Sequence, residues 1–101
     1  KGAEEYFCRA LDANIDNLLA IKSLIEISYK TENFDRVQNY LKHYLEIYPA
    51  NINMLFAMAG IQFKKGEIED SLQTLDTVLL LDPKHQYALD FQNSVRTVSV
   101  E

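Results

Sequence analysis

The sequence has little of the material from which catalytic and metal-binding sites are built. Its 101 residues include one cysteine, two histidines, three glycines and two prolines. One cysteine excludes an intramolecular disulfide and a cysteine metal site. Three scattered glycines exclude a glycine-rich phosphate loop. The two histidines, His43 and His85, are isolated from each other, so we expect both to face solvent. These shortages predict a protein that is not an enzyme and that has no catalytic residues, metal or cofactor.

Long apolar runs and an excess of basic charge are missing as well. No run approaches the about 20 residues that span a bilayer, so we expect no membrane span. The net charge is −5, which argues against a nucleic-acid partner, because a phosphate backbone needs a basic face. The lone Cys8 fits a reducing compartment, and we expect a packed thiol in a cytoplasmic protein. The chain starts at Lys1 in the middle of a pattern, so we expect a fragment of a longer protein.

What the sequence does contain is an internal repeat. Pro83 lies 34 residues after Pro49. Apolar residues ahead of Pro49 recur 34 residues later, ahead of Pro83. The apolar pairs are Ile21 and Leu55, Leu24 and Met58, Phe34 and Ile68, Leu41 and Leu75, and Leu45 and Leu79, and Val37 is matched by the small residue Ser71. A period of about 34 residues with two helices in each unit indicates a helical-repeat protein.

Apolar residues at helical spacing predict where the helices lie. The expected helices cover residues 3–12, 18–30, 34–48, 52–64, 67–81 and 84–98. Asp16 or Asn17 is expected to cap the second helix, and Asn51 the fourth. Pro49 and Pro83 are expected to stop the third and fifth helices, because proline cannot continue the hydrogen-bond ladder.

These features resemble the tetratricopeptide repeat family over nearly the whole chain. The family's repeat has a large and then a small residue in its first helix, a glycine at the turn, alternating large and small residues in its second helix, and a closing proline. In the second full repeat these marks are Leu55, Met58, Ala59, Gly66, Ile68, Ser71, Leu75, Val78 and Pro83. In the first they are Ile21, Leu24, Ile25, Glu32, Phe34, Val37, Leu41, Tyr44 and Pro49. Ile25 and Tyr44 are large where the family prefers small residues, and Glu32 replaces the glycine, so we expect looser or shifted packing there.

The resemblance implies an all-α fold, a right-handed superhelical solenoid of antiparallel helix pairs with two full repeats and flanking helices. Residues 1–101 would form a single domain. Within it, residues 1–14 would be the second helix of a partial repeat, 18–51 and 52–85 the full repeats, and 86–101 a capping helix. Phe91, Val95 and Val98 would form the inner stripe of that capping helix.

In this family the first helices of successive repeats line a concave groove, where a peptide or helix of a partner protein binds. Carried over by position, the ligand-binding residues are Lys22, Glu26, Tyr29, Asn53, Phe56, Gly60, Phe63, Lys64, Tyr87 and Asp90, with Leu19, Lys30 and Ser94 beside them. Helical spacing places Lys22, Glu26 and Tyr29 on one face independently of the resemblance. The alternative is that the aromatic residues pack between neighbouring helices and leave no trough.

Three functions compete at this point. The first is a protein-binding module with a peptide in the groove. The second is a structural or oligomerisation segment of a scaffold, self-associating through its open N-terminal helix. The third is a regulatory appendage of an enzyme that lies outside this fragment. A chaperone-type carboxylate clamp is not expected, since only Lys22 matches one of the five clamp positions. The other four positions hold Glu26, Ala57, Tyr87 and Phe91.

Overall fold

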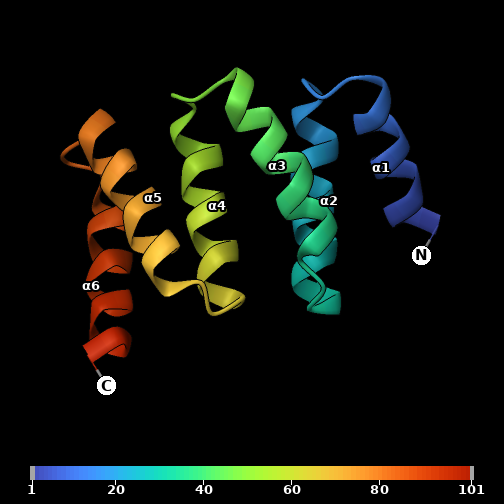
Figure 1. Ribbon diagram of the computed structural model, residues 1–101. Coiled ribbons are helices and arrows are strands. Elements are labelled where there is room, and N and C mark those ends of the chain that lie inside the picture. The colour runs from blue at the N-terminus through green and yellow to red at the C-terminus, as the bar shows by residue number, and fades with distance from the viewer. Residues whose placement is uncertain (1, 101) are drawn as a thin grey trace. The chain divides into compact units, whose positions relative to one another are not determined.

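The computed structural model describes residues 2–100, and these contain six helices and no strand (Figure 1). The helices are α1 (Gly2–Ala13), α2 (Leu18–Thr31), α3 (Asp35–Ile47), α4 (Ile52–Lys64), α5 (Ile68–Leu81) and α6 (Gln86–Val100). The predicted all-α class is therefore confirmed, and each helix begins and ends within two residues of its predicted position. The helices divide into two compact units, Lys1–Ile47 and Tyr48–Glu101.

Asparagine side chains begin the first helix of each full repeat. Asn17 Oδ1 accepts a hydrogen bond from the Ala20 backbone N–H at 3.0 Å. Asn51 Oδ1 accepts one from the Met54 N–H at 3.2 Å. Each bond satisfies a backbone donor that has no partner within its own helix. The predicted cap at Asn51 is confirmed, and of the two candidates for α2 the cap is Asn17.

The turns inside the two repeats share a left-handed backbone although their residues differ. Gly66 has φ 81°, and Glu32, at the equivalent position, has φ 57°. Glycine adopts this conformation without steric cost, whereas the Cβ of glutamate crowds the following carbonyl oxygen. The repeat geometry therefore persists where the glycine is lost, with strain at Glu32.

The first unit is built around α2, which packs against both α1 and α3 (Figure 1). Ile21 and Leu24 of α2 and Leu41 of α3 are fully buried. The sulfur-bearing side chain of Cys8 on α1 is 5% exposed, as expected for a packed thiol. Ser28 of α2 also faces the core and is 2% exposed.

In the second unit α5 packs against both α4 and α6 (Figure 1). Ala59 and Ser71 are fully buried, and the Ser71 hydroxyl donates to the Ala59 carbonyl at 2.8 Å. These small residues let the two helices approach closely. The contact between α4 and α5 is more extensive than that between α2 and α3, where the larger Ile25 and Tyr44 stand in place of Ala59 and Val78. This difference agrees with the looser packing expected in the first repeat.

The buried stripe of α6 differs from the predicted one. Ala88 and Val95 are fully buried and Gln92 is 6% exposed, whereas Val98 is 49% exposed. The prediction was wrong at Val98 because it followed apolar residues alone, while the stripe passes through a glutamine. Gln92 Nε2 donates to Asp76 Oδ1 of α5 at 2.7 Å, which satisfies the buried amide.

Candidate functional site

In the first unit the predicted binding residues lie on the exposed side of α2. Lys22, Glu26 and Tyr29 are all exposed, and their spacing of four and three residues places them on one helical face. The Tyr29 ring meets the Phe34 ring edge-to-face, with centroids 5.1 Å apart. Partial burial raises the pKa of the Tyr29 phenol. The same side of α2 exposes Leu19, which is 73% accessible to solvent.

In the second unit the predicted residues lie on α4 and α6. The exposed ones are Asn53, Lys64, Tyr87 and Asp90, and the half-buried ones are Phe56, Gly60 and Phe63. Tyr87 is 76% exposed. The Asp90 carboxylate accepts a hydrogen bond from Gln86 Nε2 at 2.9 Å, one turn earlier on α6. The set therefore combines accessible polar and aromatic groups with a half-buried apolar strip.

Phe56 and Phe63 both contact a third aromatic residue, Phe91, which the site prediction omitted. The Phe91 ring of α6 lies 5.9 Å from the Phe56 ring and 5.5 Å from the Phe63 ring, edge-to-face in both cases. Such pairs stabilise by about 0.5–1.5 kcal/mol beyond the area they bury. Phe56 and Phe63 thus use part of their surface to hold α6 against α4, and part of it stays accessible. Phe91 was readable from the sequence only as a core residue.

The sequence predicted that His85 faces solvent. In the structure its side chain caps the N-terminus of α6. Its Nδ1 accepts the Ala88 backbone N–H at 3.1 Å, which is the role that asparagine plays in α2 and α4. Its half-buried ring lies 5.5 Å from the Phe56 ring and 6.3 Å from the Tyr87 ring. The prediction failed because histidine is not among the residues usually found at helix caps. His43, in contrast, is 60% exposed, as predicted.

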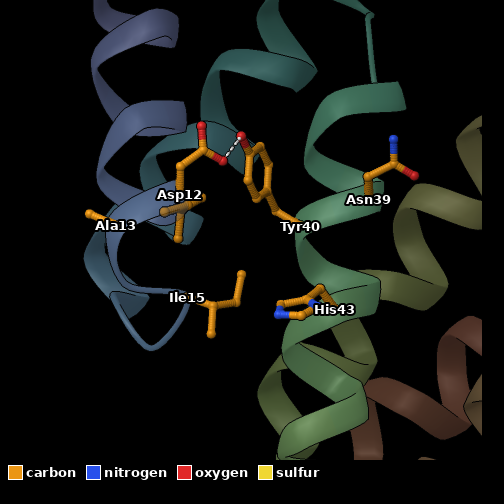
Figure 2. A pocket seen from close by; sticks show the side chains of 7 residues that line it. Asp12, Ala13, Ile15, Asn39, Tyr40 and His43 are labelled. Atoms are coloured by element: carbon orange, nitrogen blue, oxygen red, sulfur yellow. Dashed lines mark hydrogen bonds between the residues drawn. The ribbon is translucent and has the colours of Figure 1, made fainter.

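A pocket that the sequence reasoning did not identify lies within the first unit (Figure 2). It is a pocket of about 490 Å³ between the C-terminal end of α1, the following turn and α3. Its lining residues are Leu11, Asp12, Ala13, Ile15, Asn39, Tyr40 and His43. The one sequence signal was Ile15, which stands where the two full repeats carry proline.

The polar centre of this pocket is the pair formed by Tyr40 and Asp12. The Tyr40 hydroxyl donates to Asp12 Oδ1 at 2.7 Å and so joins α3 to α1 (Figure 2). Burial, and then the hydrogen bond to the Asp12 carboxylate, raise the pKa of Tyr40 well above its usual value. The phenol therefore stays protonated and donates at neutral pH. His43 Nδ1 lies 3.9 Å from Glu46 Oε1 on the same helix.

Metal binding, membrane spanning and thiol reactivity find little support in residues 2–100. Within that range no three His, Cys, Asp or Glu side chains are grouped so that they could hold a metal ion. None of the helices described there has both the length and the apolar character needed to cross a bilayer. Burial raises the pKa of the Cys8 thiol, more than the nearby Arg36 lowers it, so Cys8 is a poor nucleophile at neutral pH.

The chain matches a model of a known protein family. A family model described as tetratricopeptide repeat matches residues 28–93, which is more than half of the chain. The matched segment runs from the end of α2 into α6 and includes both left-handed turns. Comparison with curated proteins gave no match.

Proposed function

Because the chain belongs to the tetratricopeptide repeat family, we propose that it is a binding module that holds a peptide or helix of a partner protein. Repeats of this family generally mediate protein–protein interactions and are typically not enzymes. The binding face that we assign in each unit carries the predicted residues, which lie on α2 in the first unit and on α4 and α6 in the second. Scaffolding and the regulation of an attached enzyme remain uses to which such a module can be put.

The observation that carries this proposal is the exposure of large apolar side chains on that face. Leu19, Tyr29 and Tyr87 are 73%, 42% and 76% exposed. Tyrosine is enriched at binding hot spots, because its ring buries a large area while its hydroxyl still finds a partner. Lys22 on α2 and Lys64 on α4 are also exposed and can supply the polar rim that interfaces usually have. Each unit thus offers both signs of charge, with Glu26 in the first and Asp90 in the second, and the exposed rings favour a partner segment anchored by apolar side chains.

The proposal is tested by selecting peptides from a random phage-displayed library with the wild-type chain. The Kd of the selected peptides is then measured for wild type and for the double variant Tyr29→Ala, Tyr87→Ala. Both tyrosines are partly or largely exposed, so the variant is expected to fold, which circular dichroism checks. Loss of two hot-spot tyrosines should raise the Kd at least about tenfold.

The matched control is Tyr6→Ala, since Tyr6 is 69% exposed but lies on α1, which carries none of the predicted binding residues. This variant should bind the selected peptides as the wild type does. Equal binding by the double variant, or a loss caused by Tyr6→Ala instead, would refute the assigned face. Self-association that Tyr6→Ala abolishes would favour the assembly function.

A further inference from the structure

The pocket between α1 and α3 combines an apolar wall with one carboxylate. Leu11, Ala13 and Ile15 supply the wall from α1 and its following turn, and Asp12 supplies the charge (Figure 2). The described residues that line the pocket include no lysine or arginine. A ligand that suits such a lining carries a positive charge at the end of an apolar stem.

The Asp12 carboxylate is oriented and can still accept hydrogen bonds. The Tyr40 hydroxyl donates to Oδ1 at 2.7 Å and fixes the position of the group. A carboxylate has about four acceptor sites, so one bond from Tyr40 leaves most of them for a ligand. Asp12 is exposed at the pocket mouth, where a cation can reach it without first displacing protein atoms.

Two aromatic rings extend the pocket along α3. Tyr40 and His43 are three residues apart and therefore lie on the same side of the helix, facing α1 and Ile15 (Figure 2). A planar guanidinium stacks on aromatic faces and pairs with a carboxylate through two parallel hydrogen bonds, neither of which an ammonium group does. The combination of rings and carboxylate therefore favours arginine over lysine.

We propose that this pocket binds an arginine side chain from a partner protein, with the guanidinium on Asp12 and the methylene stem on Ile15. The net charge of −5 on the chain favours the approach of a basic segment. This site goes beyond the proposed function, because none of its residues belongs to the predicted face on α2, α4 and α6. The chain thus has a second binding position with its own ligand chemistry.

The test follows ¹H–¹⁵N amide shifts of the whole chain during titration with N-acetyl-arginine-N-methylamide. The matched probe is the citrulline analogue, which has nearly the same shape and no charge. Shifts caused by the arginine probe should be confined to residues 11–15 and 39–43 and should saturate with a Kd on the order of 1–10 mM, as for a ligand of this size. The citrulline probe should bind at least about fivefold more weakly.

Two variants locate the charge that matters. Asp12→Asn keeps an oxygen that can accept from Tyr40 but removes the charge, and it should weaken arginine binding to the level of citrulline. Asp16→Asn removes a charge from the turn that follows α1. Asp16 does not line the pocket, so this variant should leave the Kd within about twofold. Equal binding of both probes, unchanged binding by Asp12→Asn, or shifts outside the pocket would overturn the assignment.

Discussion

Replacing Glu32 by glycine should stabilise this protein. Glu32 ends α2 in the left-handed region at φ 57° and occupies the position that Gly66 occupies in the next repeat. The side chain of Glu32 is exposed, so the substitution removes little packing. The expected gain comes from releasing backbone strain, and it can be worked out from two opposing terms.

The left-handed conformation costs a residue with a Cβ about 1–2 kcal/mol relative to its preferred conformations. Glycine avoids that cost but loses about 0.5–1 kcal/mol more backbone entropy on folding than alanine does. The difference predicts that Glu32→Gly raises the free energy of unfolding by about 0.5–1 kcal/mol through released strain alone. For a chain of this length such a gain raises Tm by about 2–8 °C.

The assay is urea and thermal unfolding followed by circular dichroism at 222 nm. Glu32→Ala is the matched control, because it keeps the Cβ and the strain but removes a negative charge from the C-terminal end of α2. That charge opposes the helix dipole by about 0.3–1 kcal/mol, so only the difference between the glycine and alanine variants reports the strain.

Gly66→Ala provides the reverse test. No atom lies within 4 Å of a Cβ built at Gly66, whose φ is +81°. Its cost is therefore conformational and should be about 0.5–1 kcal/mol. The reasoning is refuted if Glu32→Gly is no more stable than Glu32→Ala, or if Gly66→Ala unfolds at the same urea concentration as the wild type.

Three further predictions concern other residues. Asp76→Ala should lower the unfolding free energy by about 1–2 kcal/mol in urea titrations, because the buried Gln92 amide loses its acceptor. Adding Gln92→Leu should recover most of that loss, and a further loss would contradict the reasoning. His85→Ala should cost about 1 kcal/mol by thermal unfolding, whereas His85→Asn, whose oxygen can accept the Ala88 N–H, should cost little. Equal losses in the two variants would show that the cap is unimportant. For Cys8, burial raises the native pKa above 9.0, so the folded state holds its proton more tightly. Wild-type stability relative to Cys8→Ala should therefore be constant at lower pH and fall as pH rises above 9.0. A stability advantage of the wild type that grows as pH rises would contradict this prediction.

The repeat register and the helix bounds were predictable because they depend on local signals. Asn17 and Asn51 cap helices through bonds to residues three positions later. Gly66 turns the chain through its own backbone freedom. Pro49 follows α3 closely because proline cannot continue a helix. Each of these effects acts within one helical turn, so the sequence contains the information directly.

Contacts between helices were less predictable. Gln92 has a polar side chain, yet it is buried because Asp76, sixteen residues away, supplies an acceptor. His85 reads as a solvent-facing residue, yet it caps α6 because its ring nitrogen is placed as an asparagine oxygen would be. Leu80 lies in an apolar run but is 81% exposed. Which face of a helix meets a neighbour depends on tertiary geometry, and composition alone does not reveal it.

The candidate site likewise has a part that the sequence predicted and a part that it could not predict. Helical spacing predicted that Lys22, Glu26 and Tyr29 share a face, and all three are exposed on α2. Spacing could not predict how much of Phe56 and Phe63 is used against Phe91, because that depends on how α6 packs. The pocket between α1 and α3 joins residues about 28 positions apart, such as Asp12 and Tyr40, for which no motif exists.

Site-specific photo-crosslinking tests the central claim most directly. Benzoylphenylalanine placed at Tyr87, which is 76% exposed on the predicted face, is compared with the same group at Tyr6, which is 69% exposed on α1. Each labelled chain is irradiated with a peptide selected by the wild-type chain. A protein-binding module that uses the predicted face should capture the peptide from Tyr87 and not from Tyr6. Capture from Tyr6 alone, or cross-links only between copies of the chain, would contradict the account.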